Sequence, residues 1–531
     1  MPEATLLHEL IHLSADSAPE SVALTDGRHS YTYAVLSESV RAFARALCGA
    51  GVQRSQRVAI YLEKRFETVV ASFGAPAAGA VFVPMNPLLK PEQVAFIARD
   101  CEARVLVTSS SRLSQLLPVL EHCPALDTIV LVDGAAASPA GPPASARCVA
   151  WADFMASGTA GRDGHRVIDV DMVAILYTSG STGKPKGVVL SHRNMVAGAK
   201  SVASYLGNVS SDVLLAALPL SFDAGFSQLT TAFHSGARAV LLNYLLPRDV
   251  LNAIVRESVT GLTAVPPLYL QLVQLEWPAS IDAHLRYFAN TGGRMPRDTL
   301  DQLRARVPSA KPFLMYGLTE AFRSTYLPPE QVDRRPDSIG KAIPNAEILV
   351  LRPDGTPCDA DEPGELVHRG ALVGMGYWND PEKTAERYRL LPGRESGLPL
   401  PEYAVFSGDT VRRDAEGFLY FIGRRDEMIK TSGYRVSPTE VEEILYSSQL
   451  VGECAAFGVE HATLGQSIHV IVTAREDGVG VDVDALLAEC RRRMPVYMVP
   501  GTIEVVTGPL PRNPNGKIDR KTLAEQHRRE T

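Results

Sequence analysis

The sequence predicts an α/β protein with a large domain of mixed, mostly parallel sheets flanked by helices, a β-rich subdomain, and a small C-terminal α+β domain. A chain of 531 residues is longer than one compact core usually organises. Apolar strand patterns alternate with helical patterns up to residue 132, which is typical of parallel sheets. After residue 438 the order becomes helix, strand, strand, helix, strand, which indicates a separate small unit.

The first part of the chain supplies the alternation. Residues 33–51 are the clearest helix, because Leu36, Val40, Phe43 and Leu47 recur on one helical face. Residues 134–146 are of low complexity and predict an exposed loop. The expected helices are 6–15, 33–51, 65–74 and 91–100, and the expected strands are 28–33 (a pair around a turn), 58–62, 81–83, 105–108 and 129–132.

One uncharged stretch, residues 68–85, approaches the length of a membrane span. It is interrupted by Gly74, Pro76 and Gly79 and is rich in alanine. We therefore expect a helix, a turn and a buried strand there, and no membrane insertion.

The remaining elements divide at a polar segment, residues 423–435. We place the boundary there and expect an N-terminal domain of residues 1–425 and a C-terminal domain of residues 426–531. Before the boundary, the expected strands are 172–177, 213–218, 239–242, 261–265, 287–291 and 312–315, with helices over 194–206 and after 221–229 and a β-rich region at 348–350, 364–369 and 418–421. After it, we expect helices over 438–447 and 481–493 and strands over 453–458, 468–473 and 502–506.

The composition excludes several classes of protein. Hydrophobic residues are 45% and charged residues 21%, an ordinary globular balance. A net charge of −7 argues against general affinity for nucleic acid or an anionic membrane. Seven dispersed cysteines without a CxxC pair indicate reduced thiols and a cytoplasmic location. The N-terminus lacks the basic region of a signal peptide.

Residues 177–192, YTSGSTGKPKGVVLSH, are the strongest local signal. Glycines here let the backbone approach a ligand, consecutive N–H groups form an anion-binding concavity, and two lysines add charge. The stretch therefore predicts a loop that holds a polyphosphate, against the alternative of a polar surface turn. It is not a Walker A loop, because Pro185 stands where that pattern needs glycine, and no GxGxxG follows a strand.

Further motifs follow in order along the chain. Gly317-Leu318-Thr319-Glu320 comes directly after a buried strand, where a hydroxyl beside a carboxylate suits a hydrated Mg²⁺ that carries phosphates. Alone it is equally a common way to open a helix. The others are GGR at 292–294, SGD at 407–409, GRRD at 423–426, TSGYRV at 431–436 and PRNPNGK at 511–517, whose turn residues present Lys517 on a tight loop.

Six such motifs in this order resemble the adenylate-forming superfamily, which includes acyl-CoA synthetases, adenylation domains of nonribosomal peptide synthesis, and luciferases. The resemblance covers essentially the whole chain. It implies ATP and Mg²⁺ as cofactors, with Glu320 on magnesium, Tyr316 stacked on adenine, Asp409 on the ribose hydroxyls and Lys517 as the catalytic lysine. Thr178, Lys186, Glu320 and Lys517 are the implied catalytic residues. The implied nucleotide-binding residues are Ser179, Gly180, Ser181, Thr182, Gly183, Lys184, Gly187, Gly292, Gly293, Arg294, Tyr316, Gly317, Thr319, Asp409 and Arg424.

The resemblance also implies the reaction. A carboxylate attacks the α-phosphate of ATP, pyrophosphate leaves, and an acyl-adenylate remains. Lys184 and Lys186 would face the β- and γ-phosphates, where positive charge stabilises the leaving group. The mobile small domain would then turn about Asp426 and withdraw Lys517. A pantetheine thiol would enter along the loop that contains Gly433 and attack the mixed anhydride.

The acid to be activated is indicated by Asp223, within FDAGFS at 222–227. A carboxylate in an apolar segment needs a partner. In amino-acid-activating members of the superfamily an aspartate after this phenylalanine binds the substrate ammonium; a helix N-cap is the structural alternative. The same pocket pattern gives the substrate-binding candidates Asp223, Ala224, Ser227, Ala289, Thr291, Met315, Arg323 and Ser324.

Arg323 is unusual in this pattern, because a buried guanidinium needs an anion. It pairs with Asp223, which would weaken the ammonium hypothesis, or it holds a second carboxylate or another oxygen of the substrate beside Thr291. An Asp–Arg pair resembles stand-alone adenylation enzymes for β-amino acids. Small α-amino acids and β-amino acids both remain open.

The expected function is an AMP-forming ligase that adenylates a small α- or β-amino acid and transfers it to the phosphopantetheine of a separate carrier protein. Residues 464–468 look superficially like a phosphopantetheine attachment site, but they run into an expected strand, so no carrier module is expected within the chain. The alternative is an acyl-CoA ligase that uses free CoA on a fatty or other organic acid. A catalytically silent binding protein of the same fold is a third possibility, against which the intact Lys517 and Glu320 argue.

Overall fold

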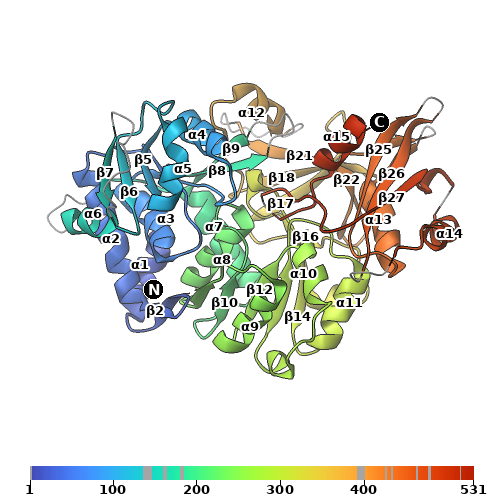
Figure 1. Ribbon diagram of the computed structural model, residues 1–531, viewed down its shortest axis with the longest axis horizontal. Coiled ribbons are helices and arrows are strands. Elements are labelled where there is room, and N and C mark those ends of the chain that lie inside the picture. The colour runs from blue at the N-terminus through green and yellow to red at the C-terminus, as the bar shows by residue number, and fades with distance from the viewer. Residues whose placement is uncertain are drawn as a thin grey trace.

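The computed structural model describes residues 3–134, 146–158, 164–179, 185–391, 401–424, 427–431, 434–461, 464–475, 480–494, 496–514 and 516–530. In this part of the chain the strands form two large sheets, an antiparallel sheet and a C-terminal sheet. Figure 1 shows the first large sheet mainly in blue and teal, the second mainly in green with β1 and β2 in blue, and the C-terminal sheet in orange and red at one end of the molecule.

The first large sheet has parallel strands from β8 to β7 and an antiparallel hairpin at its other side. In that hairpin, β8 and β9 pair in register from Tyr177 opposite Gly187 to Thr178 opposite Lys186. The glycine- and lysine-rich loop therefore joins two antiparallel strands. The spatial order is β19 (Gly376–Tyr377), β9 (Pro185–Ser191), β8 (Met172–Ser179), β4 (Val81–Pro84), β3 (Arg57–Ile60), β5 (Ala103–Thr108), β6 (Thr128–Leu131) and β7 (Arg147–Ala150).

The second large sheet is parallel from β14 to β1 and ends in antiparallel strands on both sides. Its parallel strands end at one edge, where ligand sites of open α/β sheets form. The spatial order is β16 (Lys341–Ala342), β15 (Thr325–Leu327), β14 (Lys311–Tyr316), β13 (Tyr287–Asn290), β12 (Gly261–Ala264), β10 (Val213–Ala216), β11 (Arg238–Leu241), β1 (Val22–Asp26) and β2 (His29–Thr32).

The main core lies between these two sheets and contains helices α3 (Phe66–Ala78), α7 (His192–Leu206) and α8 (Asp223–His234). Helix α8 is buried from Asp223 to Phe233, so it is a central helix with no solvent face. Phe226 of α8 stacks on Phe73 and Phe82, with ring centres 5.5 and 4.8 Å apart. This packing fixes the start of α8, which carries Asp223.

The other helices cover the outer faces and connect strands. Helix α7 begins with a capping box, because Ser191 accepts from the Asn194 backbone N–H while the Asn194 side chain accepts from the Ser191 N–H. The helices that cover the outer faces are α1 (Glu9–Ser17), α2 (Tyr33–Gly49), α4 (Pro91–Asp100), α5 (Ser110–Leu120), α6 (Trp151–Ser157), α9 (Pro247–Glu257), α10 (Pro266–Leu272), α11 (Arg297–Arg306) and α12 (Pro381–Arg387).

Two smaller sheets complete the molecule. The antiparallel sheet consists of β17 (Ala346–Leu351), β18 (Gly364–Gly370), β21 (Tyr403–Arg413), β20 (Tyr388–Leu390) and β22 (Leu419–Arg424). The C-terminal sheet consists of β24 (Tyr434–Val436), β23 (Ile429–Thr431), β26 (Gly465–Thr473), β25 (Cys454–His461) and β27 (Thr502–Val506), with helices α13 (Pro438–Ser447), α14 (Val483–Arg493) and α15 (Arg520–Glu530).

The predicted fold class is confirmed: a large N-terminal part with mixed sheets and helices is followed by a small C-terminal part. The uncharged stretch at 68–85 is the expected helix α3, a left-handed turn at Gly79 and the buried strand β4. No described helix is both long and apolar enough to cross a membrane. The strand pair expected at 28–33 is β1 and β2, and it begins earlier, at Val22. The predicted boundary at 425/426 lies outside the described residues.

Candidate active site

The candidate site lies where β10, β12, β13 and β14 end, and the loop that carries Lys517 reaches it from the C-terminal part of the chain. The segments that follow these strands hold Asp223, Thr291, Thr319 and Arg323. Because parallel strands end at one edge, residues about 100 positions apart in sequence meet here.

Asp223 is the first residue of α8 and is 3% exposed. Phe222 takes the N-cap position without a side-chain cap, so Asp223 is not the N-cap considered from the sequence. Its Oδ2 lies 3.5 Å from Nη1 of Arg323, and its Oδ1 lies 3.5 Å from the Thr319 hydroxyl. Burial raises the pKa of Asp223, while Arg323 and Lys517 act in the opposite direction.

Arg323 is among the largest fully buried side chains of the protein. Its Nη1 donates to the Thr291 hydroxyl at 3.2 Å and faces Asp223, so the Asp–Arg pair anticipated as one alternative is present. The pair is long for a charge-assisted contact. Nε of Arg323 is buried and has no hydrogen-bond partner among the described residues. The guanidinium is therefore only partly satisfied.

A small cavity of about 20 Å³ extends behind Arg323, with room for about one water molecule. The Tyr287 ring closes one end of the cavity by packing directly against Gly261, where an added Cβ would lie only 2.4 Å from the ring. The cavity is lined by Val202, Leu206, Leu214, Ala224, Ser227, Gln228, Thr231, Gly261, Thr263, Tyr287, Met315 and Arg323.

Four of the predicted substrate-binding residues, Ala224, Ser227, Met315 and Arg323, line this cavity. The other four do not line it: Asp223 and Thr291 lie beside Arg323. Ala289 is buried in the core and accepts a hydrogen bond from Tyr269 through its carbonyl. The Ser324 hydroxyl is directed to Nδ1 of His368, 2.9 Å away.

Lys517 approaches the same place from the C-terminal loop. Its Nζ lies 5.9 Å from the centre of the Phe222 ring, and its Cε would be 2.8 Å from a Cβ added to Gly292. Burial lowers the pKa of Lys517, while the negative charge of Asp223 opposes that shift. The loop is braced by the Asn513 side chain, which accepts from the Lys517 backbone N–H, and by Asn86, which donates to the Pro514 carbonyl at 2.6 Å.

Tyr316, Asp409 and Arg424 form a second group. The Tyr316 hydroxyl donates to Oδ2 of Asp409 at 2.5 Å, and Nε of Arg424 lies 3.7 Å from Oδ1. Asp409 and Arg424 are register partners in β21 and β22. Burial raises the pKa of Asp409, and Arg424 opposes the shift. Oδ1 of Asp409 is buried without a hydrogen-bond donor among the described residues, which leaves an acceptor for a hydroxyl of a ligand.

A third group joins the hairpin to the turn that holds Glu320. Tyr377 donates to Oε1 of Glu320, and Nζ of Lys186 lies 5.6 Å from the centre of the Tyr377 ring. Burial lowers the pKa of Lys186, and Glu320 opposes the shift. The Thr178 hydroxyl contacts the Lys186 carbonyl at 3.5 Å. A carboxylate held by a phenol at a strand end is the hard oxygen donor that Mg²⁺ prefers, so Glu320 fits the predicted metal role.

The glycines of the predicted site have different surroundings. Gly292 adopts φ +77 and packs against Lys517. An added Cβ at Gly187 would lie 2.6 Å from the Ile175 side chain, and one at Gly317 would lie 3.1 Å from the Arg323 backbone. The Gly293 carbonyl accepts a hydrogen bond from the Asn290 side chain at 2.9 Å, and an added Cβ at Gly293 would lie 3.4 Å from Pro266.

The Arg294 side chain pairs with Asp337 at 2.8 Å and with Glu443 of α13 at 3.8 Å, so it bridges two parts of the chain. The predicted residues Gly180, Ser181, Thr182, Gly183, Lys184, Asp426 and Gly433, and the side chain of Ser179, lie outside the described residues.

Sequence reasoning missed several residues of the site. Phe222 faces Lys517, and Tyr377 orients Glu320 across 57 positions. Gln228 braces the pocket by donating to the Leu215 and Thr263 carbonyls and accepting from the Leu218 N–H. Only Phe222 had a local signal, as the residue before the buried aspartate; the others depend on pairings that no spacing rule reveals.

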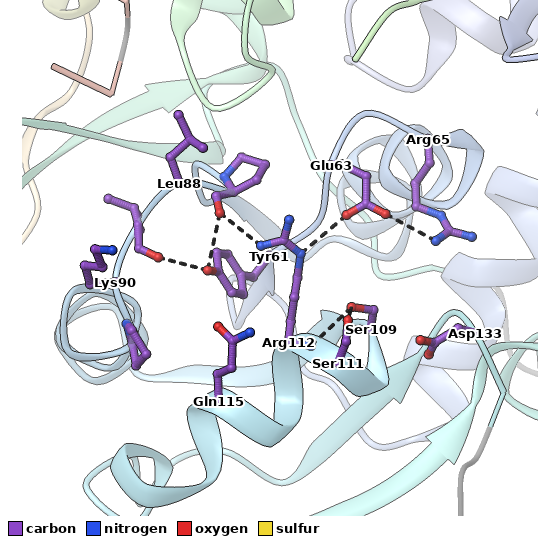
Figure 2. Close-up of a pocket in the computed structure, with 13 residues that line it drawn as sticks. Tyr61, Glu63, Arg65, Leu88, Lys90, Ser109, Ser111, Arg112, Gln115 and Asp133 are labelled. Carbon is purple, nitrogen blue, oxygen red and sulfur yellow. Dashed lines mark hydrogen bonds and ion pairs between the residues drawn. The ribbon is translucent and has the colours of Figure 1, made fainter. Parts of the chain in front are cut away.

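A larger, more open pocket of about 480 Å³ lies on the first sheet, near the ends of β3 and β5 (Figure 2). Arg112 lies over the Tyr61 ring at 4.7 Å and pairs with Glu63 at 3.4 Å, and Glu63 also contacts Arg65. The lining residues 87–91 follow Asn86 in the chain, and Asn86 is bonded to the loop of Lys517. Glu63 contacts two of the cations in the pocket, Arg65 and Arg112.

Two family models together match most of the chain. The AMP-binding enzyme family matches residues 11–378, and the AMP-binding enzyme C-terminal domain matches residues 440–517. The chain is 29% identical to the L-proline–[L-prolyl-carrier protein] ligase of Pseudomonas fluorescens, covering 98% of this chain and 99% of that protein. It is 32% identical to the 2-succinylbenzoate–CoA ligase of Geobacillus kaustophilus, covering 95% of each.

Two further comparisons concern length and fold. The chain is 28% identical to a linear gramicidin synthase of Brevibacillus parabrevis over 98% of its own length, but it spans only 10% of that protein. Its fold matches the crystal structure of the anthranilate CoA ligase AuaEII in complex with anthranoyl-AMP, with a TM-score of 0.87, 24% identity and coverage of 99% of this chain and 98% of that one.

Proposed function

The chain belongs to the AMP-binding enzyme family and is an AMP-forming ligase, and from this premise we propose that it adenylates a small α- or β-amino acid with ATP and passes it to the phosphopantetheine thiol of a separate carrier protein. The observation that carries the amino-acid assignment is the buried carboxylate of Asp223, whose contacts to Arg323 and to the Thr319 hydroxyl are both 3.5 Å long. Burial of an ion is unfavourable unless a group of opposite charge pairs with it and hydrogen-bonds to it.

Asp223 has one oxygen towards Arg323 and one towards the Thr319 hydroxyl. The contact of Oδ1 with the Thr319 hydroxyl, at 3.5 Å, is at the outer limit of a hydrogen bond, and the Ala224 backbone N–H also stabilises the carboxylate. A substrate ammonium there would add the charge-assisted hydrogen bond that this oxygen lacks, without displacing Arg323 from Oδ2. The Asp–Arg pair lowers the negative potential and so weakens the case for an ammonium, but it leaves Oδ1 open to one.

Arg323 supports a substrate with a further acceptor. Its Nε, which has no partner among the described residues, is a buried donor beside the Thr291 hydroxyl. A side-chain carboxylate, hydroxyl or amide oxygen of the substrate would satisfy it, and leaving it unpaired costs about 1–3 kcal/mol.

The size of the pocket supports a small acid over a long-chain one. The cavity behind Arg323 holds about one water, and Tyr287 against Gly261 closes it. A long acyl chain would require the aromatic floor to move. Polar groups of Ser227, Gln228 and Thr231 on the lining are better suited to a short, polar side chain.

The residues around ATP would act by position and charge. The bond from a substrate carboxylate oxygen to the α-phosphorus forms while the bond to pyrophosphate breaks. Protonated Lys517 would stabilise charge on the reacting oxygens and Lys186 charge on the leaving group. Asp409 would accept from the ribose hydroxyls, with Tyr316 beside the base and Arg424 at the ribose and phosphate. Mg²⁺ held by Glu320 would neutralise phosphate charge when bound.

The acceptor is the least constrained part of the proposal. A carrier is supported by the likeness over nearly the full length to a carrier-protein ligase. Free CoA, with the chain as an acyl-CoA ligase, is the second candidate, and the open pocket of Figure 2 is the observation that favours it. That pocket contains Arg65, Lys90 and Arg112, but Glu63 contacts both arginines, which weakens the pocket as a binding site for a nucleotide phosphate.

A pyrophosphate-exchange screen tests the substrate. The panel contains small α-amino acids, β-amino acids, amino dicarboxylic acids, their desamino analogues and fatty acids. We expect exchange with a small amino acid and at least tenfold less with its desamino analogue, because the analogue leaves Asp223 unpaired. Thioester assays with CoA and with phosphopantetheinylated carrier proteins then separate the two acceptors.

Asp223→Ala should abolish amino-acid-dependent exchange while ATP binding, measured by calorimetry, persists. Ser227→Ala is the matched control, since it removes a neutral group from the same pocket and should change exchange only a few-fold. Unchanged exchange in Asp223→Ala would rule out the ammonium assignment. Equal exchange with the desamino analogue would do the same.

A further inference from the structure

Three side chains outside the cleft converge on one face of the C-terminal sheet. His469 lies on β26 and Glu504 on the parallel neighbour β27. In the register, His469 is opposite Thr502 and Ile471 is opposite Glu504, so His469 and Glu504 lie on the same face, two positions apart. His527 comes from α15, which packs beside β25 (Figure 1).

Apolar packing holds α15 over this face. Leu523 of α15 is buried in a cluster with Phe457, Ile471 and Leu510. His527 follows Leu523 by four positions, so both project from the same side of the helix, toward the sheet. The His527 ring lies 4.0 Å from that of His469 and 6.1 Å from that of Phe457, between ring centres.

The distances between the polar atoms match those of ligands around one cation. Oε2 of Glu504 lies 3.1 Å from Nε2 of His469 and 3.9 Å from Nδ1 of His527. One ligand atom from each of the three residues lies within 4.8 Å of the other two. In a tetrahedral site with bonds of about 2.1 Å, ligand atoms are about 3.4 Å apart. Side-chain shifts of about 1 Å would complete the geometry.

We propose that His469, His527 and Glu504 form a binding site for a divalent cation of the zinc class. Two imidazole nitrogens and one carboxylate oxygen favour such a metal over Mg²⁺ or Ca²⁺, which prefer oxygen ligands. His469 is 4% exposed, whereas the side chains of His527 and Glu504 are 17% and 39% exposed. His469 is therefore buried, whereas the other two ligands are partly exposed to solvent. This leaves a position for water as the fourth ligand.

The bound cation would join α15 to β26 and β27. Helix α15 begins at Arg520, three residues after Lys517, and Arg520 pairs with Glu442 of α13 at 2.6 Å. The metal would therefore hold the far end of the helix that follows the Lys517 loop, and its role is in the stability of the C-terminal part of the chain rather than in adenylyl transfer.

Metal binding to the full-length, tag-free protein tests the proposal. After chelator treatment, Co²⁺ should give the visible absorption of a tetrahedral site at one equivalent, and Zn²⁺ should displace it. Zn²⁺ affinity is measured by competition with a fluorescent chelator. His527→Gln and His469→Gln should each weaken Zn²⁺ binding at least tenfold, because each removes one of three ligands. His122→Gln, an exposed histidine beside Glu121, is the control and should leave affinity unchanged.

Thermal unfolding gives a second readout. Saturating Zn²⁺ should raise the unfolding temperature of the wild type and of His122→Gln, and not that of His527→Gln. His527 lies near the end of a surface helix, so this variant decides the question if His469→Gln does not fold. Zn²⁺ binding that is equally tight in wild type and His527→Gln, or no tetrahedral Co²⁺ spectrum, would overturn the proposal and leave a hydrogen-bonded His–Glu pair packed against a ring.

Discussion

Gly292→Ala should separate the seating of Lys517 from the stability of the protein. An added Cβ would lie 2.8 Å from Cε of Lys517, 3.6 Å from Nζ and 3.3 Å from a methyl of Val265. Carbon atoms pack at about 3.5–4.0 Å, so the lysine end must retreat by about 1 Å. A misplacement of about 1 Å at a reacting centre costs up to about 100-fold in rate. We expect pyrophosphate exchange to fall about 10- to 100-fold, an increase of about 1.4–2.7 kcal/mol in the barrier.

The backbone of Gly292 adds a second effect that must be removed by a control. At φ +77 an alanine costs about 1–2 kcal/mol of stability. Gly508 has φ +82 and nothing within 4 Å of an added Cβ, so Gly508→Ala carries the same backbone strain without touching Lys517. Both variants should unfold at similarly reduced temperatures, and only Gly292→Ala should lose exchange activity. Exchange within about twofold of wild type in Gly292→Ala, or an equal loss in Gly508→Ala, would refute the reasoning.

Two pH effects follow from buried groups. Burial lowers the pKa of Lys517, and the protonated lysine is the form that stabilises developing negative charge. Pyrophosphate exchange should therefore fall as pH rises through a value below the 10.5 of a free lysine. Lys517→Arg does not titrate in this range and should flatten the alkaline limb of the pH profile. Burial lowers the pKa of His8 to about 4 and those of His12 and His192 to about 3, whereas all three titrate near 6.5 when unfolded. The contribution of these neutral histidines to the free energy of unfolding is complete above pH 6.5 and is lost as pH falls, by on the order of 6 kcal/mol together at pH 5. A urea midpoint that is equal at pH 7.5 and pH 5 would contradict this.

The fold could be predicted to the extent that its signals are local. The helical spacing at 33–51 gave α2 to within two residues, and the Gly-Pro-Gly interruptions of 68–85 correctly placed a helix, a turn and a strand. The order of strands could not be derived, because β1 pairs with β11 across more than two hundred residues and no local pattern encodes that partner. Strand β21, the longest described at 11 residues, was expected only as the motif around Asp409.

The candidate site divides in the same way. Asp223, Thr319 and Arg323 were named from residue type and motif, and the structure brings them within contact distance. Tyr377 and Gln228 were missed, since each acts through long-range hydrogen bonds and carries a type of side chain found anywhere in a protein. A sequence pattern reveals charged residues in apolar segments, because such residues are costly to bury. It does not reveal which tyrosine or glutamine hydrogen-bonds to them or to the strands around them.

Under the proposed function, the Asp223–Arg323 pair would determine which acids the enzyme accepts. An ion pair that is buried and fully hydrogen-bonded would be inert toward substrate, but here the contacts of Asp223 to Arg323 and to the Thr319 hydroxyl are both 3.5 Å long, and Nε of Arg323 has no partner among the described residues. An acid that lacks both an amino group and a second acceptor would have to bind beside these two unsatisfied groups, and sites built this way reject such analogues by about 10⁴-fold. A substrate with both groups satisfies each without breaking the pair. Under the proposed function, the β8–β9 hairpin and Lys517 would serve any carboxylate, and selection among carboxylates would depend on whether the substrate adds hydrogen-bond partners to Asp223 and Arg323.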